Sequence, residues 1–117
     1  MARHQETGKY GERLAADFLL DKGYQILHTN WRFKNWELDI IASKNNRLHI
    51  VEVKTRRSSV FGHPEENIDN KKMQYLINAA EEFMYQNPIW KQLQFDVVAI
   101  TISKDKVDYF FIEDVYL

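Results

Sequence analysis

The stretch WELDIIASKNNRLHIVEVKTR, residues 36–56, decides the fold. It contains two apolar-rich runs of strand length, residues 36–43 and 47–55, with Asn45-Asn46 between them. Asn tolerates the positive φ that a two-residue type I′ turn requires at its central positions. The segment therefore predicts an antiparallel hairpin that turns at this pair.

The turn also fixes which residues of the two strands face each other. It pairs Lys44 with Arg47, and the same register predicts the further pairs Ser43–Leu48, Ile41–Ile50, Asp39–Glu52 and Glu37–Lys54. Because side chains alternate along a strand, one face would carry Glu37, Asp39, Ile41, Leu48, Ile50, Glu52 and Lys54. The opposite face would carry Trp36, Leu38, Ile40, Val51 and Val53. The first face is then apolar near the turn and densely ionisable at its far end.

The Asp39–Glu52 pair is costly for a sheet. Side chains directly opposite each other have Cβ atoms about 4.5–5.5 Å apart, where like charges destabilise the strands. Both acids also interrupt runs, LDII and IVEV, that are otherwise typical of buried strand. Such a pair needs a cation, which can be a hard divalent metal, a neighbouring ammonium such as Lys54, or both. An ordinary ion pair on a solvated face explains each residue alone, but the three together favour a functional site.

The rest of the chain supplies helices and strands around this hairpin. Apolar spacing predicts a helix over residues 7–22, ended by Gly23, and a second helix that Asp69 caps and Pro88 ends. Strands are expected at residues 24–32, 94–103 and 106–112, and a polar loop at residues 56–67. The order α-β-β-β-α-β-β predicts an α/β fold with a mixed sheet of about five strands flanked by helices, in which the second helix crosses between the third and fourth strands. We expect one domain spanning residues 1–117.

Composition excludes several classes of protein. The 44% hydrophobic and 28% charged fractions are typical of an ordered soluble domain. A mean hydropathy of -0.53 without a long apolar run argues against a membrane protein, and the N-terminal residues lack the apolar core of a signal peptide, so we expect a cytoplasmic location. The chain has no Cys, which excludes disulfides and thiolate chemistry. A net charge of -1 means that nucleic-acid binding would depend on a local basic patch.

The ordered motifs resemble a known family. An acidic residue on one strand, E-x-K on the next and a Glu on a preceding helix resemble the PD-(D/E)xK nuclease superfamily, which has a restriction-endonuclease-like fold. The closer resemblance is to the small bacterial YraN-like family, which is similar to archaeal Holliday-junction resolvases. The matching segments are GERLAADFL (11–19), GYQILHTNWR (23–32), ELDIIA (37–42), VEVKTR (51–56), Lys72 on the second helix and FDVVAI (95–100).

The resemblance implies a role for each matching residue. Asp39 and Glu52 would bind Mg²⁺ or Mn²⁺ together with the Val53 carbonyl, and Lys54 would be the catalytic motif lysine. Glu12 matches an acid on the first helix that often completes the site. An acid favoured by the helix dipole in the first turn explains Glu12 equally well.

Basic residues outside the carboxylate pair would hold backbone phosphates. The candidates are Arg56, Arg57, Lys72 and Arg13, although a solvated helix lysine is an equal explanation of Lys72. The chain departs from the family at Trp36, where a Gly is common, and at Gln94, where an Arg is common; the second change removes an expected phosphate contact. Asp96 and the four histidines are better explained as structural or solvated residues.

Two functions from different classes follow. The first is a metal-dependent nuclease that hydrolyses phosphodiester bonds, with branched or single-stranded DNA favoured over RNA. The alternative is a non-catalytic nucleic-acid-binding module that keeps the nuclease fold; the near-neutral charge favours it, and the intact set Asp39, Glu52 and Lys54 argues against it. A weaker third interpretation makes the C-terminal VDYFFIEDVYL, residues 107–117, the surface of a homodimer. No membrane partner is expected.

Overall fold

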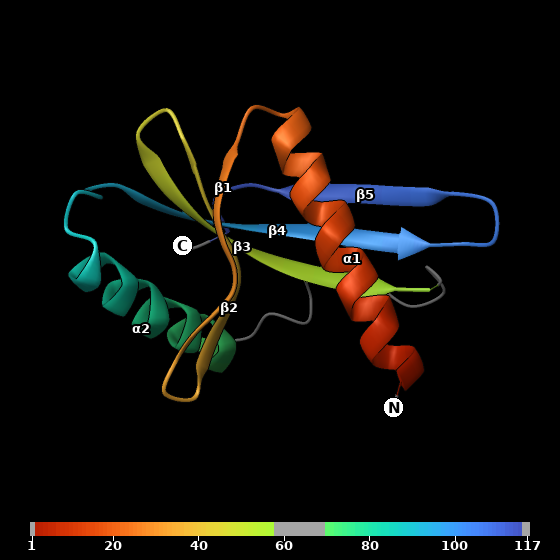
Figure 1. Ribbon diagram of the computed structural model, residues 1–117, viewed down its shortest axis with the longest axis horizontal. Helices are drawn as coiled ribbons and strands as arrows, with labels where there is room; N and C mark the ends of the chain where they lie inside the picture. The colour runs from red at the N-terminus through yellow and green to blue at the C-terminus, as the bar shows by residue number, and fades with distance from the viewer. Residues whose placement is uncertain (1, 58–69, 116–117) are drawn as a thin grey trace.

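The computed structural model describes residues 2–57 and 70–115. These residues form one sheet and two helices (Figure 1). In chain order the elements are α1 (Ala2–Asp21), β1 (Gln25–Phe33), β2 (Trp36–Lys44), β3 (Arg47–Arg56), α2 (Asn70–Gln86), β4 (Leu93–Ile102) and β5 (Val107–Ile112). The strands lie in the order β1-β2-β3-β4-β5. β3 and β4 are parallel, and the other neighbours are antiparallel. The mixed α/β sheet and the order of elements predicted from the sequence are confirmed.

The two helices cover opposite faces of the sheet. Alternate residues of β3 show this: Val51 belongs to the apolar cluster that includes Leu19 of α1, and Ile50 belongs to the cluster that includes Leu76 and Phe83 of α2. α2 connects the parallel strands β3 and β4, as a crossover must. The central strands therefore pack between the two helices.

Turn residues place these elements as the sequence predicts. Asn45 and Asn46 have φ of 52° and 64°, the two positive values that a type I′ turn needs. Gly23 has φ of 92° just beyond α1. There the N–H of Gly23 bonds to the carbonyl of Leu20, and the N–H of Tyr24 bonds to that of Leu19, both at 3.0 Å. These are the two bonds of a Schellman cap, which ends α1 and starts β1.

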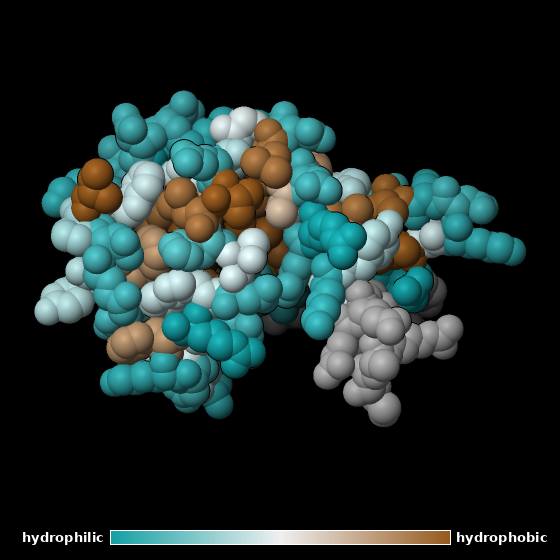
Figure 2. All heavy atoms as spheres, viewed as in Figure 1, coloured by the Kyte–Doolittle hydropathy of each residue, from teal (hydrophilic) through white to brown (hydrophobic). Residues whose placement is uncertain are grey.

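The surface agrees with this layered arrangement. The face shown in Figure 2 is mostly hydrophilic, with smaller apolar areas between the charged side chains. Neither helix of the described residues is long and apolar enough to cross a bilayer.

Two sequence predictions about local structure need correction. α1 begins at Ala2 and not near Thr7, because Gly8 does not interrupt the helix. The regular alternation of side chains breaks in β2: Leu38 packs with Ile41 under α2, whereas Ile40 packs under α1. The face predicted for Leu38 is therefore wrong. Two further predictions, the loop over residues 56–67 beyond Arg57 and the Asp69 cap, lie outside the described residues.

Candidate functional site

The break in alternation occurs where β2 and β3 separate. Their ladder keeps the predicted register from Lys44–Arg47 to Ile40–Val51 and ends there. The predicted ladder pairs Asp39–Glu52 and Glu37–Lys54 are absent from the β2–β3 ladder. Glu37 is instead the ladder partner of Arg32 on β1, and Arg32 Nη2 lies 3.3 Å from Glu37 Oε2. Just beyond the last ladder pair, a side chain joins the two strands.

That side chain is Asp39. Its Oδ2 accepts a hydrogen bond of 2.9 Å from the backbone N–H of Val53 on β3. A carboxylate thus takes the place of a main-chain acceptor at the point of separation. In a strand the N–H and C=O of one residue point to the same neighbour, so the Val53 carbonyl also faces the gap beside Asp39. This bond joins Asp39 to Val53, the two residues that the resemblance assigns to one site.

Asp39 and Glu52 lie in direct contact although they are not ladder partners. The negative charge of Glu52 acts on Asp39, because two carboxyl groups that lie close together oppose each other's ionisation. Burial raises the pKa of Asp39 to about 7, and the negative charge of Glu52 adds to this rise, while the bond from Val53 opposes it. Glu52 itself is 5% exposed. The pair therefore concentrates negative charge at a partly buried site.

Two lysines approach the pair from the Glu52 side. Lys72 Nζ lies 3.2 Å from Glu52 Oε2, and Lys54 Nζ lies 3.7 Å from the same oxygen. Lys54 comes from β3, two residues beyond Glu52, and Lys72 comes from the first turn of α2. The predicted motif lysine and the helix lysine therefore both reach the carboxylates, and partly offset the charge of Glu52.

Glu12 approaches from the other helix. Its charge contributes to the raised pKa of Asp39, so α1 brings this acid near the pair. The neighbouring Gly11 explains how: a Cβ at Gly11 would overlap the side chain of Thr55 on β3. Only a glycine lets α1 approach β3 this closely. The close approach puts Glu12 beside the site, as the resemblance implied.

A hollow opens from Asp39 to the surface. Its volume is about 320 Å³, and it is lined by Asn35, Trp36, Glu37, Asp39, Lys72, Tyr75 and Leu76. The aromatic rings of Trp36 and Tyr75 thus stand beside a carboxylate and an ammonium. Such a hollow can admit a group that carries both an anion and a flat apolar part.

The oxygen atoms at this site are of the kind that bind a hard divalent cation. Asp39, Glu52 and the Val53 carbonyl offer oxygen ligands, which Mg²⁺ and Mn²⁺ prefer. Within residues 2–57 and 70–115, no three His, Asp or Glu side chains are already gathered at ligand distance, so Glu12 would stand outside a first set of ligands.

Comparison with known proteins identifies the family. Residues 11–100 match the model described as "Uncharacterised protein family UPF0102". The chain belongs to the UPF0102 family. A UPF0102 protein of Flavobacterium psychrophilum is 44% identical over 112 residues, which cover 94% of each chain. A UPF0102 protein of Phocaeicola vulgatus is 37% identical over 116 residues, covering 99% of this chain and 96% of the relative. These names state no activity, so the chemistry of this UPF0102 chain has to be argued from its own residues.

The other predicted site residues occupy separate positions. Arg13 is exposed on α1, Arg56 is half-buried at the end of β3, and Arg57 is exposed just beyond it. Arg56 is the last residue of β3 and Arg57 follows it, so both lie at the same end of this strand as Lys54. The phosphate-binding role predicted for these arginines stays a prediction.

Sequence reasoning missed a second polar site of this UPF0102 chain. His49 and Asp96 form a buried pair, with Nδ1 and Oδ2 2.8 Å apart. Asp96 is a structural acid, as the sequence suggested: it accepts hydrogen bonds from the backbone N–H of Asp114 and the amide of Gln94, and it bonds to the His49 ring. These contacts depend on the parallel register of β3 with β4. No turn residue in the sequence predicts that register.

Proposed function

We propose that this protein is a metal-dependent nuclease of the PD-(D/E)xK type that hydrolyses phosphodiester bonds in branched or single-stranded DNA. The observation that supports this most is the close approach of the half-buried Asp39 to the buried Glu52 where β2 and β3 separate. A pair of carboxyl groups that oppose each other's ionisation is a poor structural element. It is a suitable place for a divalent cation.

Each residue of the pair has a defined task in this proposal. Asp39, fixed by the Val53 N–H, and Glu52 would hold Mg²⁺ or Mn²⁺ together with the Val53 carbonyl. The bound ion would supply positive charge to the scissile phosphate and lower the pKa of a water molecule.

Lys54 and Lys72 would act on the phosphate. Both ammonium groups lie within 4 Å of Glu52, so a phosphate beside the pair would meet them as well. Lys54 would orient the attacking water or neutralise charge that develops in the transition state. Lys72 lines the hollow that opens from Asp39 and would contact the substrate on its way in. Arg56 and Arg57, which continue β3, would hold neighbouring phosphates.

The rings at the hollow support a substrate with unpaired bases. Trp36 and Tyr75 line it together with Asp39, and Tyr75 is 42% exposed. Unpaired bases stack on such rings, whereas paired bases are already stacked on each other. DNA with single-stranded or branched segments fits this better than uniform duplex.

A non-catalytic nucleic-acid-binding module is the second candidate. The observation that favours it is that Lys72 and Lys54 already offset the charge of Glu52, so the pair can persist without a metal. In that case the carboxylates and lysines would be an internal ion-pair network. The two candidates differ in one outcome, which is bond cleavage.

Cleavage assays on labelled duplex, single-strand, flap and four-way DNA, with Mg²⁺ or Mn²⁺, separate the candidates. Lys54→Ala should abolish cutting with little change in binding, because Lys54 is assigned to the transition state. Lys106→Ala is the matched control, since its side chain is 71% exposed and its Nζ lies 3.8 Å from Asp108 Oδ2, away from the carboxylate pair. DNA bound but never cut with either metal would establish the binding module. Neither binding nor cutting would refute the assignment to nucleic acid.

A further inference from the structure

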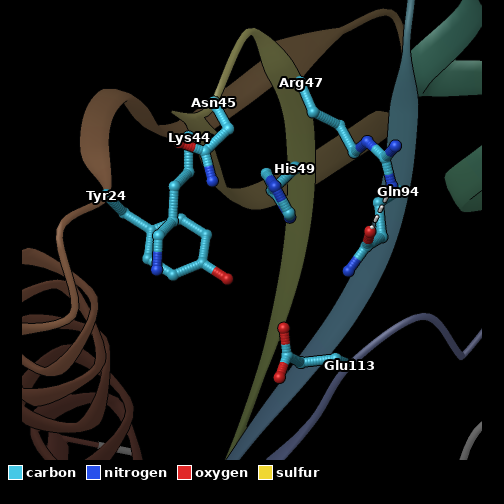
Figure 3. Close-up of a pocket in the computed structure, with 7 residues that line it drawn as sticks. All are labelled: Tyr24, Lys44, Asn45, Arg47, His49, Gln94 and Glu113. Atoms are coloured by element: carbon cyan, nitrogen blue, oxygen red, sulfur yellow. Dashed lines mark hydrogen bonds between the residues drawn. The ribbon is translucent and has the colours of Figure 1, made fainter.

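A second pocket lies at the turn of the β2–β3 hairpin, far along β3 from the carboxylate pair. Its volume is about 270 Å³, and it is lined by Tyr24, Lys44, Asn45, Arg47, His49, Gln94 and Glu113 (Figure 3). Three basic side chains come together in it from two adjacent strands. Nothing in the proposed nuclease chemistry uses them.

Two of these cations oppose each other. Lys44 and Arg47 are direct partners in the ladder between β2 and β3. Like charges at such positions destabilise a sheet, and the type I′ turn does not require them. A negatively charged ligand between them would remove this cost.

Each of the two cations is also fixed from behind. Arg47 donates to Gln92 Oε1 at 3.0 and 3.2 Å and to Gln94 Oε1 at 2.9 Å. Lys44 Nζ donates to the carbonyl of Lys22 at 2.7 Å and lies 4.9 Å from the centre of the Tyr24 ring. These partners are neutral, so they hold the side chains in place without cancelling their charge. Little conformational entropy would then be lost when an anion binds.

His49 completes the basic wall from inside the protein. Its residue is 5% exposed, and Nδ1 bonds to the buried carboxylate of Asp96, which is 1% exposed. The other contacts of Asp96, from the Gln94 amide and the Asp114 N–H, are donors as well, each at 2.9 Å. The proton of the His49–Asp96 bond therefore belongs to Nδ1, and the imidazole has its orientation fixed. Figure 3 shows the ring between Lys44 and Arg47, facing the pocket.

The other polar groups that line the pocket favour an anion at one end of it only. The Tyr24 phenol keeps its proton, because burial and the nearby charges of Asp96 and Glu113 raise its pKa to about 12, so it can donate a hydrogen bond. Glu113 is exposed, and in Figure 3 it lies away from Lys44 and Arg47, beyond His49. An anion would therefore sit at the hairpin end of the pocket.

We propose that this pocket binds a phosphate group, carried either by a small phosphomonoester or by a nucleic-acid strand. Phosphate has several strong acceptor oxygens and up to two negative charges, and it matches a guanidinium and an ammonium that face it from two strands. A single carboxylate would leave part of this basic wall uncompensated. The proposal does not depend on nuclease activity at the carboxylate pair.

Calorimetric titration of the full chain with inorganic phosphate, ribose 5-phosphate and a short DNA strand bearing a 5′-phosphate tests the proposal. We expect binding of at least one probe, weakened about tenfold or more by Arg47→Gln, because a bidentate charged contact is lost. Arg32→Gln is the matched control: this arginine has a 73% exposed side chain and pairs with Glu37 on the same sheet.

The three probes distinguish the source of the phosphate. Binding of inorganic phosphate and ribose 5-phosphate with equal sensitivity to Arg47→Gln would indicate a small phosphomonoester. Binding of the DNA strand alone, with the same sensitivity, would indicate a nucleic-acid phosphate. Absence of binding at millimolar concentration, or equal binding by Arg47→Gln and wild type for every probe, would overturn the proposal.

Discussion

Replacing Asp39 by Asn should stabilise the protein in a pH-dependent way. The Asn oxygen can still accept the Val53 N–H bond of 2.9 Å, while the charge that opposes Glu52 disappears. In wild type the folded protein raises the pKa of Asp39 from 3.8 to about 7. The folded state therefore holds a proton that the unfolded chain loses near pH 4, so the favourable contribution of Asp39 is complete below that pH and is lost as the pH rises through 7.

The magnitude follows from the same shift. One pKa unit corresponds to 1.36 kcal/mol, so a rise of about three units sets a ceiling of about 4 kcal/mol on the cost of the ionised Asp39. Part of this cost is offset by local relaxation and by the lysines at Glu52. We expect the free energy of unfolding of Asp39→Asn to exceed that of wild type by about 2 kcal/mol above pH 7 and by nearly nothing at pH 4.

Urea denaturation at a series of pH values between 4 and 8, without divalent ions, measures this difference. Glu37→Gln is the matched control, because its side chain is 39% exposed and pairs with an exposed Arg32. That variant should stay close to wild type at every pH. If Asp39→Asn is less stable than wild type above pH 7, or if the difference does not change with pH, then the two carboxyl groups do not oppose each other as described.

The remaining predictions concern the packing of α1 and the buried acid. Gly11→Ala should lower the free energy of unfolding by about 1–3 kcal/mol, because its methyl group would overlap Thr55. Gly8→Ala, where a Cβ meets nothing within 4 Å, should raise it by about 0.5–1 kcal/mol; equal effects in urea denaturation would contradict the close approach of α1. Asp96→Asn should cost about 1–3 kcal/mol, because an amide would meet the His49 ring and other donors, and unchanged stability would argue against that network.

The sequence predicted the hairpin well because its turn is determined locally. Two Asn residues at positive φ fix the turn, and the turn fixes the register as far as Ile40–Val51. Beyond that pair the register alone could not show that the strands separate. The bond from Val53 to the Asp39 carboxylate replaces a ladder bond, and it depends on side-chain geometry.

The candidate site was predictable in part for the same reason. Asp39 and Glu52 stand out because they interrupt apolar strands, and the hairpin brings them to the same end of the two strands, although they are not ladder partners. Lys72 is contributed by α2, which is about twenty positions away in the chain, and its sequence resembles that of any solvated helix lysine. The pocket at the hairpin turn could not be foreseen, because it also needs the register of β4 along β3 that brings Gln94 beside His49.

The central claim is that Asp39 and Glu52 form a divalent-metal site. Isothermal titration of the wild-type chain with Mn²⁺, compared with Asp39→Asn and Glu52→Gln, tests it most directly. The account predicts one saturable site per chain in wild type, lost or strongly weakened in both variants, and unchanged in Glu37→Gln. Absence of binding to wild type, or equal affinity in wild type and in both variants, would contradict the claim.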